Sequence, residues 1–164
     1  MATKSSALRG HLVIWTSFIV ALILQTTPWP GALEPFRPNW VLLVATYWVM
    51  ALPHRVNVGS AMVLGLLWDL MLGSTLGVRA LTMSILIYLV AINFQLLRNL
   101  SLWQQAMLVA CLGVLGKLIE FWAEYVISNI TFLPELLWSA LLNFLLWPWL
   151  FLLLRRIRRQ FAIR

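Results

Sequence analysis

The sequence predicts an all-α membrane protein, a bundle of six transmembrane helices that forms one domain over residues 1–164. Composition is the first reason. Hydrophobic residues make up 62% of the chain and charged residues only 10%, whereas about 25% of a typical soluble domain is charged. A soluble domain of this size cannot bury so much apolar surface, but lipid accepts it. The second reason is that the apolar residues lie in six runs, with basic residues at the ends of the runs.

The six runs predict six helices. We place them at residues 11–27, 39–52, 56–72, 78–97, 102–128 and 134–154, and a basic tail follows over residues 155–164. The first run follows Lys4 and Arg9, as the apolar segment of a cleavable signal peptide does. It leads into Pro28 and Pro30 without a small-residue cleavage site, and more apolar runs follow. We therefore expect a permanent helix.

The second run is unusually short. Residues 39–52 would rise about 21 Å as a helix, less than the ~30 Å hydrocarbon core. Pro38 suits the first turn of a helix, and Pro53 marks the far end. This segment is either a short helix shielded by its neighbours or one half of a helical hairpin with the third run.

The remaining runs have the features of longer or closely packed helices. In the third run, Ala61 and Gly65 have the spacing of small residues that lets membrane helices approach each other. A tight connection joins the third run to the fourth. The fifth run is long enough to cross the membrane with tilt, and Pro148 is expected to kink the sixth.

The distribution of basic residues predicts the orientation. With six spans and a cytoplasmic N-terminus, nine basic residues lie inside: Lys4, Arg9, Arg55, Arg98, Arg155, Arg156, Arg158, Arg159 and Arg164. Only Arg37 and Arg79 lie outside. Because basic residues gather on the cytoplasmic side of short loops, we expect both termini in the cytoplasm. No basic stripe alternates with aromatics on an aqueous face, so we expect no nucleic-acid partner.

Three charged residues lie within the fifth run. Lys117, Glu120 and Glu124 share one stripe of the helix, because residues three and seven apart point the same way. A charge at mid-helix costs about 2.5–3.5 kcal/mol on insertion, so each needs a partner or a purpose. We expect an ion pair between Lys117 and Glu120 that faces the bundle interior. Two alternatives remain: the stripe docks a partner's helix or a polar ligand, or it belongs to a proton or ion relay.

The connection between the third and fourth runs carries a second charged pair. Asp69 lies one turn before the end of the third run, and Arg79 opens the fourth. The connection is short enough for a salt bridge that pins this hairpin. Gly73 and Gly77 fit it, since glycine permits positive φ and close helix approach.

Motifs of enzymes and metal sites are absent from the sequence. It has no H-E-x-x-H, no C-x-x-C, no phosphate-binding G-x-x-x-x-G-K-[ST] and no G-x-S-x-G. Cys111 is the single cysteine, and His11 and His54 are the two histidines. None of them has a second cysteine or histidine at the spacing of a metal site. We therefore expect no enzyme, no cofactor and no metal site.

Several stretches resemble the bacterial rod shape-determining MreD family, in its enterobacterial form. They are Phe36-Arg37-Pro38-Asn39-Trp40, residues 52–59, residues 65–81 and Leu146-Trp147-Pro148-Trp149. Residues 69–79 are the most specific part, and the resemblance covers nearly the whole chain. It makes Pro38, Asn39 and Trp40 candidates for structural or partner-binding roles. At the start of the charged stripe, where the family leads us to expect an acidic residue, this chain has Lys117.

The resemblance implies a non-enzymatic component of the cell-elongation machinery in the bacterial inner membrane. Its expected partners are MreC, the actin-like MreB, RodZ, and RodA with its elongation transpeptidase. It also implies a six-helix arrangement similar to the substrate-binding subunits of energy-coupling-factor transporters.

Two functions are compatible with these features. The first is a scaffold that binds the transmembrane helix of MreC and helps to organise lateral peptidoglycan synthesis. The second is a small-solute-binding subunit of a transporter, with a pocket near Asp69, Arg79, Glu120 and Glu124. In either case the arginine-rich tail would attract anionic lipid.

Overall fold

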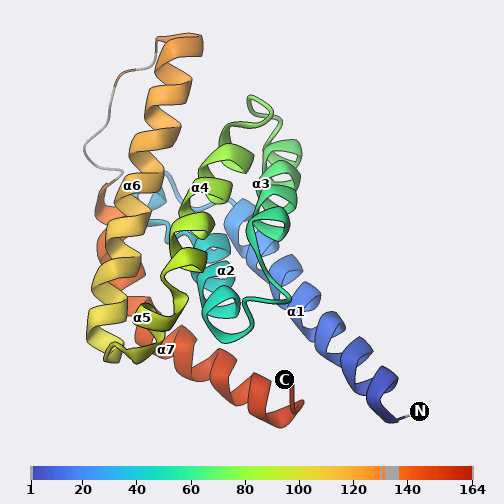
Figure 1. The fold of residues 1–164 in the computed structure, drawn as a ribbon. Helices are drawn as coiled ribbons and strands as arrows, with labels where there is room; N and C mark the ends of the chain where they lie inside the picture. Colours follow the sequence, from blue (N-terminus) through green and yellow to red (C-terminus); the bar gives the residue numbers. More distant parts are fainter. Residues whose placement is uncertain (1, 130, 132–136, 164) are drawn as a thin grey trace.

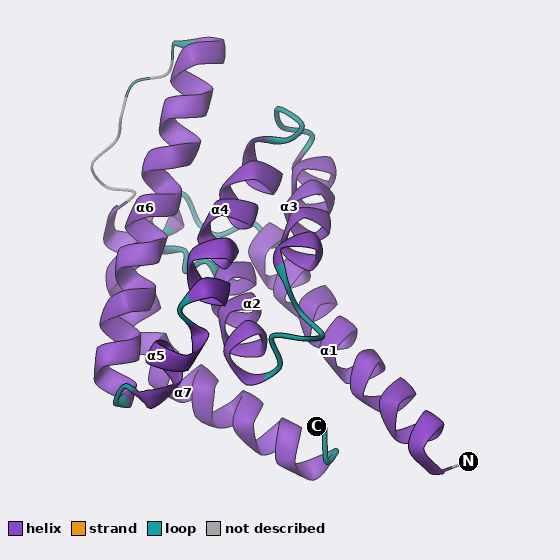
Figure 2. Cartoon of the chain, viewed as in Figure 1, coloured by secondary structure: helices purple, strands orange, loops and turns teal. Residues whose placement is uncertain are grey.

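The computed structural model describes residues 2–129, 131 and 137–163. This part of the chain is all helix, turn and loop, without a β-strand, as Figure 2 shows. In chain order the elements are α1 (Ala2–Thr26), the 3-10 helix η1 (Glu34–Phe36), α2 (Trp40–Ala51), α3 (Val58–Leu72), α4 (Val78–Ile92), α5 (Phe94–Asn99), α6 (Leu102–Ser128) and α7 (Trp138–Gln160). The predicted all-α class is confirmed.

The short helix α2 is the centre of the fold. Every residue from 41 to 50 is buried, and α1, α4, α5, α6 and α7 all pack against it (Figure 1). The indole Nε1 of Trp48 donates to Ser17 Oγ at 2.9 Å, which ties α2 to α1. Of the two predicted forms of this segment, the structure shows the short helix shielded by its neighbours.

Among the described residues, three helices are long and apolar enough to cross a membrane: α1, over Ala7–Thr26, and the whole of α6 and α7. The helices α3 and α4 are also apolar but shorter. The outward faces carry large exposed apolar side chains, among them Leu12, Met107 and Leu145. Such faces suit contact with lipid rather than water, and the chain is a multi-pass membrane protein.

The fourth predicted helix is wrong as a single element, because the chain breaks at Asn93 into α4 and α5. The backbone N–H of Asn93 bonds to Val90 O, a tight final turn. Its side chain Nδ2 donates to Leu89 O at 3.0 Å. Asparagine competes for backbone groups in this way and weakens a helix interior. The structure therefore has seven α-helices in the described part rather than six.

Two further boundaries need correction. The first helix begins at Ala2 rather than at residue 11. The last helix continues to Gln160, so most of the predicted tail is helical. In both cases polar residues mark the edge of the apolar run, but lysine and arginine are good helix formers and the helix continues through them.

The predicted start of the last helix at Pro134 lies outside the described residues. Pro148 lies inside α7, which changes direction in Figure 1, as predicted.

The helices α3 and α4 form the most closely packed pair. A Cβ atom built on Gly65 would lie 2.5 Å from Ala80 Cα and 2.6 Å from Arg79 O, both backbone atoms of α4. Gly65 therefore permits close approach within the chain, and its buried neighbour on the same face, Ala61, is 1% exposed.

We expect Gly65→Ala to lower the free energy of unfolding by about 1–3 kcal/mol, because the added methyl group meets backbone that cannot move aside. The measurement is thermal unfolding of the purified protein in detergent, followed by tryptophan fluorescence. The matched control is Gly116→Ala in α6, where the new Cβ would meet no backbone but the flexible end of Leu86 at 2.9 Å and, at an ordinary contact distance of 3.6 Å, Thr82 Cγ2. Both substitutions gain the same helix propensity, so equal effects would contradict the close-approach argument.

Candidate functional site

The carboxylate of Asp69, at the end of α3, caps the first turn of α4. Oδ2 accepts hydrogen bonds from the backbone N–H groups of Gly77 at 3.0 Å, Arg79 at 3.2 Å and Ala80 at 3.4 Å. These N–H groups have no partner inside their own helix, and a negative charge is favoured at a helix N-terminus. Asp69 is 0% exposed, so one buried side chain fixes the start of the next helix.

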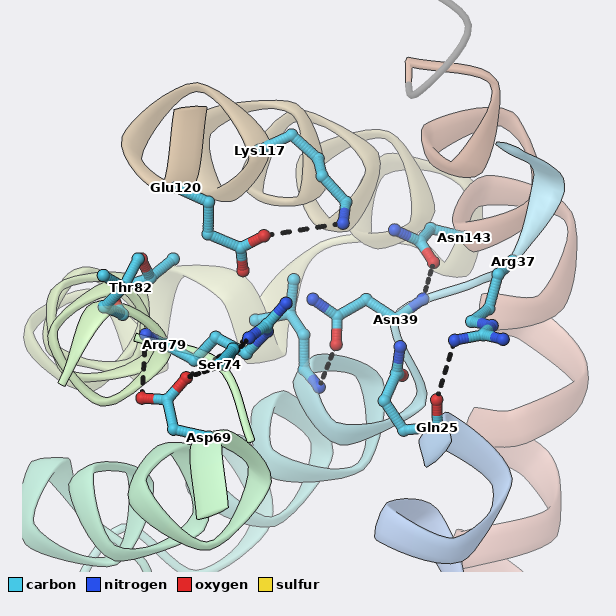
Figure 3. A network of polar contacts seen from close by, with 12 residues as sticks. Gln25, Arg37, Asn39, Asp69, Ser74, Arg79, Thr82, Lys117, Glu120 and Asn143 are labelled. Atoms are coloured by element: carbon cyan, nitrogen blue, oxygen red, sulfur yellow. Dashed lines mark hydrogen bonds and ion pairs between the residues drawn. The ribbon is translucent and has the colours of Figure 1, made fainter. Parts of the chain in front are cut away.

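Arg79 balances this buried charge. Its Nη1 lies 3.3 Å from Asp69 Oδ1 and also donates to Ser74 Oγ, which in turn donates to Asp69 Oδ1 at 3.3 Å. The guanidinium lies over the ring of Trp68, 5.1 Å from its centroid, in cation–π geometry. The predicted salt bridge is present, and it belongs to a larger network (Figure 3).

The two glycines of the connection have the backbone conformation that was expected. Gly73 has φ 62° and Gly77 has φ 97°, a region that other residues adopt only at a cost. Gly73 closes α3, with its N–H bonded to Asp69 O and Leu70 O. Gly77 brings the chain back so that its own N–H reaches the Asp69 carboxylate. The turn is therefore shaped around Asp69.

On α6, Lys117 Nζ lies 3.5 Å from Glu120 Oε2. The two side chains are 25% and 11% exposed, and Figure 3 shows both pointing toward the space that Arg79 and Asn39 also face. The predicted interior ion pair is thus present. Glu124 is half-exposed and makes no hydrogen bond or ion pair with any residue that the structure describes.

Asn39 begins α2 and satisfies its first turn. The side chain Oδ1 accepts from Leu42 N at 3.1 Å, and the backbone N–H donates to Asn143 Oδ1 of α7 at 2.9 Å. The next N–H, of Trp40, donates to Gln25 Oε1 of α1 at 2.9 Å. Pro38 and Asn39 are buried. The candidates Pro38, Asn39 and Trp40 therefore lie where α1, α2 and α7 meet.

Three residues of this network were missed by sequence reasoning. Arg37 donates from Nη1 to Gln25 O in the last turn of α1 at 3.1 Å, and from Nη2 to the carbonyl of Thr27, just after the helix, at 3.0 Å. It therefore caps the C-terminal end of α1. Gln25 and Asn143 supply the bonds to α2 described above. For Gln25 and Asn143, the sequence offers one signal: a side-chain amide in an apolar run needs a hydrogen-bond partner. It does not say which residue that partner is.

A cavity of about 170 Å³ lies among these groups. Its walls include the cations Arg37, Arg79 and Lys117 and the carboxylate of Glu34, with Asn39 and Trp68. The indole Nε1 of Trp68 and Nε of Arg79 are buried and have no partner among the described residues. The cavity thus lies between the Asp69–Arg79 pair, the Lys117–Glu120 pair and the start of α2. The polar groups that face it are mainly hydrogen-bond donors. Within the described ranges no three His, Cys, Asp or Glu side chains gather as a metal site would require.

We expect Asp69→Asn to lower the free energy of unfolding by about 3–5 kcal/mol, since it leaves the Arg79 guanidinium unpaired in the protein interior. Exchanging the two residues, Asp69→Arg with Arg79→Asp, should not restore stability, because arginine cannot accept the three backbone N–H bonds. Thermal unfolding in detergent measures both effects, with Glu124→Gln as the control that should leave stability unchanged. Full rescue by the exchanged pair would show that the ion pair alone holds the hairpin.

Comparison with known proteins places this arrangement in a family. Residues 6–157 match the family described as rod shape-determining protein MreD. The chain is similar to the rod shape-determining protein MreD of Haemophilus influenzae, with 44% identity over 147 residues that cover 90% of this chain and 91% of the relative. No solved structure matches the chain. The match extends from α1 to α7 and includes the buried Asp69 network, so this chain belongs to the MreD family of rod shape-determining proteins.

Proposed function

We propose that this protein is a scaffold of the cell-elongation machinery in the bacterial inner membrane, and that it works by binding the transmembrane helix of MreC. Membership of the MreD family, whose members are non-enzymatic shape-determining membrane proteins, supports this proposal. MreB, RodZ and RodA with its transpeptidase would join the same assembly and organise lateral peptidoglycan synthesis.

The single observation that carries the binding proposal is an apolar groove between α1 and α7. It has a volume of about 610 Å³, and α2 forms its floor. The α1 wall contains the small residues Thr16, Ser17 and Ala21, and small residues line helix–helix contacts in membranes. The hydroxyls of Thr16 and Ser17 already donate to carbonyls of α1. A partner helix in this groove would meet an apolar wall without unsatisfied polar groups.

The charged stripe of α6 is a less suitable docking site. Lys117 and Glu120 pair with each other toward the bundle interior, which leaves only Glu124 for a partner. The solute-binding alternative is also less well supported, because the cavity beside Arg79 and Lys117 is about 170 Å³, whereas ligand pockets usually measure about 300–1,000 Å³.

We further propose six membrane crossings with both termini in the cytoplasm, with α4 and α5 together forming one crossing. The described basic residues support this, since Arg55 belongs to the α2–α3 connection, Arg98 to α5 and the α7 arginines to the C-terminal part of that helix, and these segments lie at one end of the bundle in Figure 1.

For the orientation, we expect a cysteine in place of Thr75, in the exposed α3–α4 turn, to react with a membrane-impermeant maleimide in spheroplasts. A cysteine in place of His54, in the exposed α2–α3 turn, should react only after permeabilisation. Both variants carry Cys111→Ser to remove the native thiol. The reverse pattern would place the termini in the periplasm.

For the groove, we expect Val20→Trp to cause loss of rod shape in cells that depend on this protein, because the larger ring fills the space that a partner helix needs. The matched control is Met107→Trp on α6. Val20 and Met107 are apolar, helical and similarly exposed, at 54% and 65%. Microscopy measures cell shape, and a photo-crosslinking residue at each position tests contact with MreC.

Crosslinks to MreC from position 20 and few from position 107 are the expected result. Crosslinks from position 107 alone, or normal rods with the Val20→Trp variant, would rule out the groove as the docking site. Cells that keep their rod shape without the protein would exclude the scaffold function itself.

A further inference from the structure

A second polar cavity, at the opposite end of the bundle, is not explained by the scaffold function. It has a volume of about 270 Å³ and opens where α2 ends. Arg98 of α5 and Arg155 and Arg158 of α7 line it, together with Tyr47 of α2. The break at Asn93 creates this juxtaposition, because it gives Arg98 a helix of its own that packs against α2.

The three guanidinium groups have no counter-charge within the described part of the chain. None of them makes a hydrogen bond or an ion pair there. The described carboxylates lie elsewhere: Glu34 lines the other cavity, Asp69 and Glu120 pair with that cavity's cations, and Glu124 lies one turn beyond Glu120. Three like charges around one cavity repel each other, so the arrangement favours a bound anion.

The walls of the cavity are fixed rather than loose. Gln105 donates from Nε2 to Leu97 O at 2.9 Å and to Leu100 O at 3.3 Å, which joins α5 to α6. Tyr47 is 2% exposed, and its ring packs edge-on against Phe151 at 5.3 Å. Tyr47 lines the cavity, and its hydroxyl has no hydrogen-bond partner among the described residues. A held hydroxyl donor and three arginines suit the oxygens of a phosphate group.

The surface next to the cavity changes from apolar to basic along α7, which matches the acyl chain and the charged headgroup of a lipid. Along α7, the exposed Trp149 and Leu152 give way to the exposed Arg155 and Arg156 within one turn. Leu152, Arg155 and Arg156 line one continuous depression on this surface, and Arg155 also lines the cavity. An acyl chain can therefore lie on the apolar part while the headgroup reaches the arginines.

We propose that this cavity binds the phosphate of an anionic phospholipid, in the leaflet that faces the arginines of α7. A free phosphate ion would gain the same contacts with Arg98, Arg155 and Arg158, but it would make no use of the apolar surface beside them. Basic pockets between membrane helices recognise headgroups in this way. Lipid bound here would hold α5 and α7 together.

The test uses purified full-length protein in detergent, with phosphatidylglycerol and phosphatidylcholine as probes and native mass spectrometry as the measurement. We expect one tightly retained phosphatidylglycerol per protein and at least about tenfold weaker binding of phosphatidylcholine. Arg98→Gln and Arg158→Gln should each weaken phosphatidylglycerol binding about tenfold, because each loses a charge-assisted bond. Tyr47→Phe, which removes only the hydroxyl, should weaken it a few-fold.

The matched control is Arg9→Gln on α1, which removes one exposed charge that lines neither the cavity nor the depression beside it and should weaken binding by at most about twofold. Equal weakening by all three arginine variants would show diffuse attraction to basic residues and overturn the proposal. So would equal binding of the two lipids, or displacement of phosphatidylglycerol by millimolar inorganic phosphate, which would indicate a soluble anion. If a variant fails to fold, these two measurements on the unmodified protein decide the question.

Discussion

The structure depends on one constraint: inside a membrane protein, the backbone groups at helix ends must find partners within the protein. Helix α2 has only twelve residues and α4 fifteen, so their first turns lie within the bundle rather than in water. The chain satisfies these turns with side chains from other helices. Asp69 of α3 accepts the N–H groups of α4. Gln25 of α1 and Asn143 of α7 accept those at the start of α2.

This constraint explains why the polar residues of such an apolar chain cluster. A carboxylate that caps α4 brings a buried charge with it, and Arg79 neutralises that charge. The arginine then needs Ser74 and the ring of Trp68 to complete its surroundings. The buried network in Figure 3 is therefore an outcome of short helices packed around α2, and it holds α1, α2, α3, α4 and α7 in register.

The two ends of the bundle differ in how their charges are balanced. Around the cavity next to Asp69, the three cations Arg37, Arg79 and Lys117 each have a carboxylate or carbonyl partner. At the other end, Arg98 of α5 and Arg155 and Arg158 of α7 line one cavity and have no such partner among the described residues. Nearly all of the described chain is helix, so the surfaces that it offers to a partner are helix faces and the short connections between them. The apolar groove and the unpaired arginines are two such surfaces, and they suit different occupants, a helix and a headgroup.

The sequence by itself determined the all-α class, the position of the central helices and the closest charged pair. The predicted range 102–128 matches α6, and the ranges 39–52 and 56–72 match α2 and α3 to within two residues, because apolar runs and capping residues are local signals. Asp69 and Arg79 could be paired because only a short turn separates them. The tertiary structure decided the rest. Asn39 bonds to Asn143 from 104 positions away, and Arg98 lines a cavity with Arg155 and Arg158 because the chain breaks at Asn93. Local patterns set where a helix forms, but long-range packing sets which side chain satisfies its ends.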